Sequence, residues 1–99
     1  MLLLVGTFRL PAHRLDAARP VMSRMVAASR EEDGCVDYVY AEDLFAPGLI
    51  HVRELWRDRA ALDRHFASDH LRDWRASWSE LGIGGRDLRL YEVGDPVST

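Results

Sequence analysis

The sequence predicts an α+β fold in which a four-stranded antiparallel sheet carries two helical units on one face. Three observations predict it. One segment with a strand-like pattern lies near each end of the chain, and two more lie next to each other in its middle. Helical periodicity fills the two gaps between them. A short turn joins the middle pair, so the order is β-α-β-β-α-β, the ferredoxin-like arrangement.

The first half begins with an apolar strand, Leu2–Leu10, which ends at Pro11. From His13 to Glu32, apolar residues recur at helical spacing, which predicts a helix with one apolar face. Pro20 lies inside this helix. If Asp16 is the N-cap, Pro20 is the fourth helical residue and removes only one early hydrogen bond. Otherwise the helix kinks or starts later.

Two alternating segments follow, Cys35–Leu44 and Leu49–Arg57, with a turn at Ala46–Gly48 between them. They predict an antiparallel hairpin, with Cys35 facing away from the tyrosines of its strand. The residues predicted to share one face of the first strand are Val36, Tyr38, Tyr40 and Glu42. Those predicted to share one face of the second are Ile50, Val52, Glu54 and Trp56.

The second helical unit is predicted to be broken in two. Asp58 can cap a short helix over Arg59–Ala67, and Ser68 can cap the next. The glycines of Gly82–Gly85 end that second helix, and Arg86–Val93 alternates as the last strand. The apolar stripe of the second helix consists of Leu71, Trp74, Trp78 and Leu81.

Composition limits the possible functions of the chain. Its 99 residues fit one domain, 1–99, with the tail 95–99 expected to be frayed. All 13 basic residues are arginines and are interspersed among 16 acidic ones, which argues against nucleic-acid binding. The single Cys35 excludes an internal disulfide and fits a reducing compartment. Arg9 interrupts the apolar start too early for a membrane span, so we expect a cytoplasmic protein without membrane association.

The sheet face opposite the helices is predicted to be partly apolar. It carries Val5 or its neighbours, Val39, Leu55, Tyr91 and Val93 among polar groups. An open, half-apolar sheet in so small a domain favours a partner. We therefore expect a homodimer that buries this sheet face.

Three segments carry a resemblance to a known family: SREEDGCVDY (Ser29–Tyr38), ELW (Glu54–Trp56) and ALDRHFASDH (Ala61–His70). In order and spacing they resemble the antibiotic biosynthesis monooxygenase (ABM) domain, and the element pattern matches over nearly the whole chain. The resemblance implies a dimeric ferredoxin-like α+β barrel. Similar members include cofactor-free oxygenases of quinols or polyphenols, haem-degrading enzymes, an isomerase-like branch and many proteins of unknown activity.

The haem-degrading branch fits the chain poorly. Its members pair a tryptophan on the third strand with an asparagine on the first and a haem-ligating histidine on the last helix. Trp56 matches the tryptophan, but the chain contains no asparagine and has Thr7 and Phe8 on its first strand. Trp74 and Arg75 stand near the ligand position. Two of the three positions therefore depart from that branch.

His65 and His70 are the first candidates for chemistry. On one continuous helix a spacing of five turns the two rings about 140° apart, whereas a break at Ser68 lets both approach a common pocket. No third ligand stands at an obvious spacing, so we expect no metal site. The structural interpretation places His65 at the end of one helix and His70 in the first turn of the next. The functional interpretation, which depends on the resemblance, is that one ring binds a phenolic substrate and shuttles its proton.

Glu54 and Trp56 share the strand face predicted to look toward the helices. A carboxylate there must be paired or neutral. Glu54 is therefore either ion-paired with an arginine such as Arg9 or hydrogen-bonded to a neighbouring histidine, or it acts as a base or the orienter of a histidine base. Trp56 is either a core aromatic or a wall of a flat pocket. The remaining candidates for contacting substrate are Tyr38, Tyr40, Phe66 and Arg9, the last as the cation beside a developing anion.

These residues could serve a cofactor-independent monooxygenase that oxidises a quinol or polyphenol-like aromatic with O₂. Such chemistry needs a dry aromatic cavity, a proton acceptor and a cation. We expect no cofactor, because the glycines of Gly82–Gly85 do not form a nucleotide-binding motif. Two alternatives stay open: a non-catalytic dimeric module that binds a small ligand, and an isomerase or lyase acting on a carbonyl metabolite.

Overall fold

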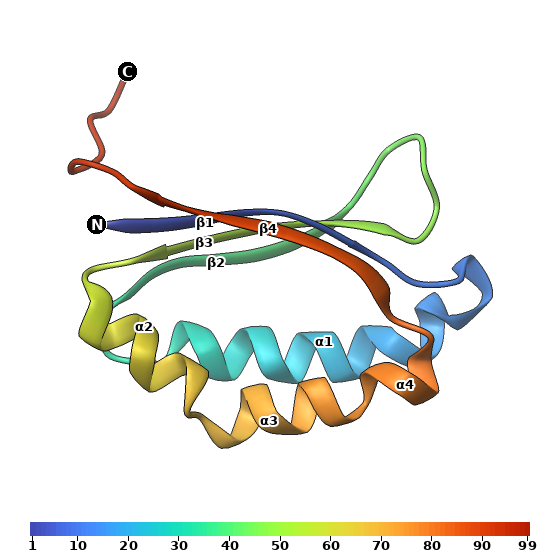
Figure 1. Ribbon diagram of the computed structural model, residues 1–99. Helices are drawn as coiled ribbons and strands as arrows, with labels where there is room; N and C mark the ends of the chain where they lie inside the picture. Colours follow the sequence, from blue (N-terminus) through green and yellow to red (C-terminus); the bar gives the residue numbers. More distant parts are fainter.

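The computed structural model describes residues 1–99 and has two layers, a sheet and a set of helices on one of its faces (Figure 1). Neighbouring strands are antiparallel and follow the order β2-β3-β1-β4, so the predicted ferredoxin-like fold is confirmed. The strands are β1 (Leu2–Arg9), β2 (Cys35–Glu42), β3 (Leu49–Trp56) and β4 (Gly84–Glu92). The helices are the 3₁₀ turn η1 (Ala12–Arg14), α1 (Leu15–Arg30), α2 (Arg59–Phe66), α3 (Asp69–Ala76) and α4 (Trp78–Leu81).

Helix α1 begins differently from the prediction. Asp16 is not its N-cap, because the chain enters the helix through η1 and Leu15 is already helical. Pro20 is therefore the sixth helical residue rather than the fourth, and the helix continues through it to Arg30. The proline lacks only the N–H that would bond to the carbonyl of Asp16, one turn earlier.

The core fills the space between the helices and one face of the sheet. Alternate residues of β3, from Ile50 to Trp56, are buried there, as predicted. In β2 a bulge changes the alternation: Cys35 pairs with Trp56 and Asp37 with Leu55, which leaves Val36 as the extra residue. Cys35 therefore packs against the core and Val36 is 49% exposed, so the predicted orientations of these two residues are wrong.

The helical unit after β3 is broken where the sequence predicts. The Asp58 carboxylate accepts a hydrogen bond from the Ala61 N–H at 2.9 Å and so begins α2. Ser68 begins α3: its Oγ accepts from the Leu71 N–H at 3.3 Å and donates to the His65 carbonyl at 2.7 Å. A further break at Ser77 separates α3 from the single turn of α4. The predicted apolar stripe extends over both helices.

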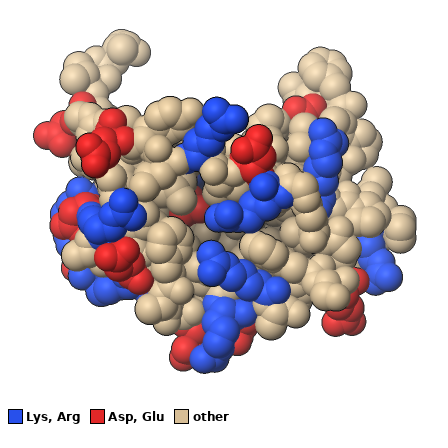
Figure 2. All heavy atoms as spheres, viewed as in Figure 1, with Lys and Arg blue, Asp and Glu red and all other residues tan.

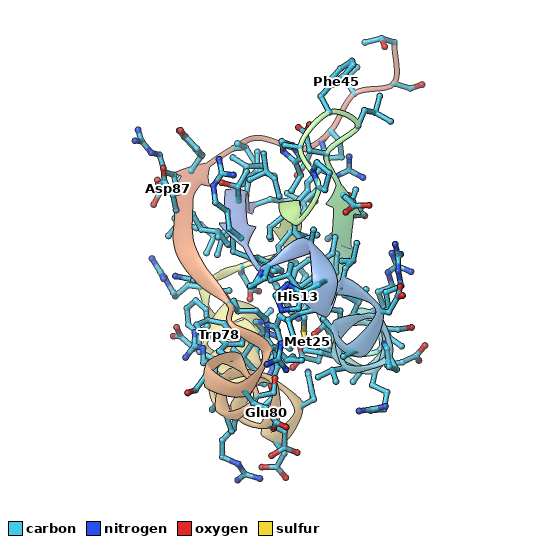
Figure 3. The ribbon with its side chains drawn as sticks, turned by 90° about the vertical axis from the view of Figure 1, so that its right-hand side faces the viewer. His13, Met25, Phe45, Trp78, Glu80 and Asp87 are labelled. Carbon is cyan, nitrogen blue, oxygen red and sulfur yellow. The ribbon has the colours of Figure 1, made fainter.

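A view turned by 90° shows the two layers end on (Figure 3). Met25 lies between the helices, and Phe45 lies at the tip of the β2–β3 hairpin, away from them and 92% exposed (Figure 3). Strand β4 begins at Gly84, earlier than predicted, and runs very close to β1: a Cβ added to Gly6 would lie 1.9 Å from the Asp87 carbonyl oxygen. None of the helices combines the length and apolar character needed to cross a membrane.

Candidate active site

The side chain of His65 lies at the centre of a buried polar cluster. The residue stands in the last turn of α2 and is 1% exposed. Its Nδ1 lies 2.8 Å from Oε2 of Glu32, while its Nε2 points the other way, 3.4 Å from the Tyr38 hydroxyl and 3.8 Å from Oε1 of Glu54. The Trp56 indole packs against the imidazole with ring centroids 4.6 Å apart. The ring is therefore held by a hydrogen bond on one edge and by aromatic contact on its face.

Glu32 is the member of this cluster that sequence reasoning missed. It belongs to the turn after α1, where Gly34 adopts a φ of +86°, a conformation that favours glycine. The turn brings the Glu32 carboxylate to two histidines, since Oε1 lies 3.2 Å from His70 Nε2 and Oε2 faces His65. No local spacing signals this contact, because Glu32 and His65 are 33 residues apart.

Glu54 is buried on β3, as its strand position predicts. Its Oε1 accepts a hydrogen bond of 3.0 Å from Nε1 of Trp56. Arg86 and Arg75 line the same cavity as Glu54, and their charges act on its carboxylate. Arg9, which the sequence suggested as the partner, is exposed, and its stem lies over Gly85 at the start of β4. The pairing suggested between Glu54 and Arg9 is therefore wrong.

Burial favours the uncharged forms of these groups. It raises the pKa of Glu32 to about 7, with a further increase from Glu54 and a decrease from Arg64. Burial also raises the pKa of Glu54, against the hydrogen bond from Trp56 and the charge of Arg86. The pKa of His65 falls to about 4, first through burial and then through His70. At neutral pH the His65 imidazole is consequently neutral, the form that accepts a proton.

A narrow cavity of about 20 Å³ opens beside His65, on the side that its Nε2 faces. That volume is roughly the space of one water molecule. The cavity is lined by Phe8, Tyr38, Tyr40, Val52, Glu54, His65, Phe66, Leu71, Trp74, Arg75, Trp78, Arg86 and Leu88. Its outer wall contains the exposed side chains of Arg75, Arg86 and Phe66. Basic side chains gather in the middle of the molecular face on which β4 lies above the helices (Figure 2).

The structure therefore brings together only some of the sequence-based candidates, and Arg9, Trp56 and His70 lie outside the cavity. His65, Glu54, Tyr38, Tyr40 and Phe66 line the cavity together. Trp56 is fully buried behind His65 and is not part of the cavity wall.

His70 lies outside the cavity, on the Glu32 side of His65, where its ring centroid is 5.9 Å from that of His65. With Glu32 and His65 it also forms a group of three potential metal ligands. The third ligand, Glu32, stands at no obvious spacing from the histidines in the sequence and so could not be found from it.

Comparison with known proteins places the chain in a family. The family model described as "Antibiotic biosynthesis monooxygenase" matches residues 1–77. A Mycobacterium tuberculosis protein named "Putative monooxygenase" is 37% identical over 66 residues, which cover 67% of this chain and 64% of that protein. An uncharacterised Synechocystis protein is 22% identical over 95% of this chain. The sequence match spans 64% of the length of each of these relatives.

Solved structures agree with this placement. A protein from Deinococcus radiodurans, also described as a candidate antibiotic biosynthesis monooxygenase, superposes with a TM-score of 0.90 at 26% identity. That match covers 100% of this chain and 98% of the other. The structure of the Mycobacterium tuberculosis protein gives a TM-score of 0.82 at 28% identity, with 98% of both chains covered. The chain belongs to the antibiotic biosynthesis monooxygenase family.

Proposed function

We propose that this protein is a monooxygenase that oxidises a quinol or a related electron-rich phenol with O₂, without an organic cofactor, and that His65 is its base. The observation that carries the proposal is the orientation of the His65 imidazole. Its Nδ1 is held by Glu32, so its Nε2 is directed toward the cavity beside Tyr38 and Glu54. A neutral imidazole oriented in this way by a carboxylate is suited to general-base catalysis.

The chemistry requires only the substrate and dioxygen. His65 Nε2 takes the proton of the phenolic O–H, and the resulting phenolate is electron-rich enough to reduce O₂. One oxygen atom enters the ring at a C–H position and the other leaves as water. The quinol itself supplies all four electrons and becomes a hydroxyquinone. Arg75 and Arg86 would stabilise the phenolate, because they bring positive charge to the cavity.

The cavity must widen before an aromatic ring can enter, because its present volume is about 20 Å³. Its outer wall can yield without unfolding the core. Phe66 is 42% exposed, and the side chains of Arg75 and Arg86 are also exposed. Side-chain rotation at these positions opens the cavity toward solvent, while Tyr38 and Val52, which also line it, remain fixed by burial.

Oxygen uptake with a panel of quinols and polyphenols tests the proposal. We expect protein-dependent uptake with at least one substrate, a hydroxylated quinone as product, and at least a roughly hundredfold loss of kcat in His65→Gln. His51→Gln is the matched control, because His51 also pairs with a carboxylate, that of Asp43 at 2.8 Å, but on the exposed surface. Absence of uptake with every substrate would refute the proposal.

Two other outcomes would identify the alternatives. Saturable binding of a phenol without product would indicate a ligand-binding module. Conversion of a carbonyl compound without oxygen consumption would indicate an isomerase or lyase.

We also propose that the protein is a cytoplasmic homodimer formed through the outer face of the sheet. Val5, Val39 and Leu55 are half-buried on that face, and Tyr91 is 47% exposed. A partner that covers these side chains would remove apolar surface from water. Sedimentation analysis should give twice the chain mass, and Val39→Arg should give the monomer. A monomeric wild-type protein would contradict this proposal.

A further inference from the structure

We infer that Glu32, His65 and His70 form a binding site for a divalent transition-metal ion such as Zn²⁺. Each residue comes from a different element: the turn after α1, the last turn of α2 and the first turn of α3. The fold brings one ligand atom from each to within 4.8 Å of the others. Two imidazoles and one carboxylate are a ligand set that zinc uses in proteins, with further positions left to water.

Small side-chain movements would complete the geometry. Metal–ligand bonds of 2.0–2.1 Å place the ligand atoms of a tetrahedral site about 3.3 Å apart. Oε2 of Glu32 already lies 2.8 Å from His65 and Oε1 lies 3.2 Å from His70. Since no two ligand atoms are more than 4.8 Å apart, no separation has to shorten by more than about 1.5 Å. The His70 side chain is 24% exposed and can rotate to provide this, whereas His65 is fixed in the core.

The ring of His70 supports the inference independently. Its Nε2 is buried and has no hydrogen-bond partner, although Oε1 of Glu32 is only 3.2 Å away. The distance suits a hydrogen bond but the direction does not. Buried polar atoms are almost always satisfied, so an atom left without a partner needs an explanation. A metal ion bound between the two side chains would satisfy the nitrogen and the oxygen together.

The far edge of His65 faces acceptor groups of the kind that metal-bound histidines use. Such a histidine donates its other N–H to a carboxylate or another acceptor, which fixes the ring. His65 Nε2 lies 3.8 Å from Oε1 of Glu54 and 3.4 Å from the Tyr38 hydroxyl. Glu54 is itself held by the indole of Trp56. Glu32 and Glu54 flank one imidazole, and a doubly charged cation beside them would stabilise their ionised forms, which burial alone disfavours.

The donor atoms indicate which ions fit. Imidazole nitrogen favours Zn²⁺, Co²⁺, Ni²⁺ and Cu²⁺, whereas Mg²⁺ and Ca²⁺ require mostly oxygen ligands. An ion can reach the site from solvent, because His70 also lines an open groove between α1 and α3. Arg24 and Asp73 line the same groove, so its charge is mixed.

Metal binding would change the role of His65, and this consequence rests on the proposed function. A metal on Nδ1 leaves the proton of the neutral imidazole on Nε2, the atom that faces the cavity. His65 could then donate a hydrogen bond to a phenol but could not accept its proton. The ion is therefore expected to inhibit the quinol oxidation rather than support it.

Calorimetric titration of ZnCl₂ into chelator-treated, tag-free protein tests the site, and the visible absorption of bound Co²⁺ reports its coordination. We expect one ion per chain. Glu32→Gln and His70→Gln should each raise Kd more than about tenfold, because even a lost supporting contact costs a metal site that much. His51→Gln, which removes an exposed histidine, should leave Kd unchanged. Far-UV circular dichroism of each variant verifies the fold.

The absence of saturable binding would overturn the inference, as would an unchanged Kd in folded Glu32→Gln and His70→Gln. These measurements use neither quinol nor oxygen. Zinc binding without oxygen uptake would therefore support the metal site and reject the oxygenase. Oxygen uptake without zinc binding would support the oxygenase and reject the metal site.

Discussion

Replacing Ser68 with alanine should both destabilise the fold and loosen the proposed metal site, because this serine makes the break between α2 and α3. Its Oγ accepts a hydrogen bond from the Leu71 N–H and donates one to the His65 carbonyl. These two bonds connect the last turn of α2, which carries His65, to the first turn of α3, which carries His70. Alanine removes both bonds and leaves the backbone groups to water.

The size of the effect follows from the two bonds. Losing a serine N-cap typically costs about 1 kcal/mol. The 2.7 Å bond to the His65 carbonyl is worth roughly another 0.5–1 kcal/mol. The free energy of unfolding should therefore fall by about 1.5–2 kcal/mol. For a chain of this length each kcal/mol lowers Tm by roughly 4–8 °C, so Tm should fall by about 6–16 °C.

Urea and thermal unfolding followed by circular dichroism measure the loss, with zinc affinity as the second readout. Ser79→Ala is the control for stability, because Ser79 is exposed and its side chain makes no hydrogen bond. Asp58→Ala is the control for position, since it removes the cap at the other end of α2. Kd for Zn²⁺ should rise in Ser68→Ala and remain unchanged in Asp58→Ala. Equal stability of Ser68→Ala and Ser79→Ala would refute the reasoning.

Three further predictions concern the core. Gly6→Ala should lower the free energy of unfolding, measured with urea, by about 3 kcal/mol, because its Cβ would overlap the Asp87 carbonyl of β4. A loss below about 1 kcal/mol would contradict the close approach of the two strands. Trp56→Phe removes the N–H bonded to Glu54 and should cost about 1–3 kcal/mol, with a smaller loss when Glu54 is already glutamine. Glu54→Gln should gain stability relative to the wild type as the pH rises above about 4.5, since the raised pKa of Glu54 makes the folded state hold its proton more tightly than the unfolded state. If the pKa of Glu54 were not raised, unfolding curves measured between pH 4.5 and 8 would show the same difference in stability between the two proteins at every pH.

Local signals were sufficient to predict most of the fold. Asp58 and Ser68 cap helices as their side chains suggest, and Gly82 ends the last helical turn in the left-handed conformation. These features depend on a few neighbouring residues, so one sequence contains all the information needed. The bulge at Val36 could not be predicted, because it depends on the register of β2 against β3. The alternation of apolar and polar residues alone gives no sign of a bulge.

The candidate site was predictable only in part. Glu54 was placed correctly, since period-two alternation puts it beside Trp56 on the buried face. Glu32 was not found, because its contact with His65 depends on how the turn after α1 meets α2. The sequence did contain a signal for the correct arginine: Arg86 is two positions before Leu88, which lies on the helix-facing side of β4. The same alternation places Arg9 on the face opposite Phe8, so Arg9 could have been excluded.

The bulge in β2 has a consequence for the chemical reactivity of the only thiol in the chain. By turning Cys35 toward the core, it partly removes this side chain from water, and burial together with Glu32 raises the pKa of the thiol to about 11. The thiolate is the species that reacts with alkylating reagents and oxidants, so very little of it exists at neutral pH. Folded protein should therefore react more slowly with maleimides and peroxide than unfolded protein, so one extra residue in a strand would lower the reactivity of the thiol beside it.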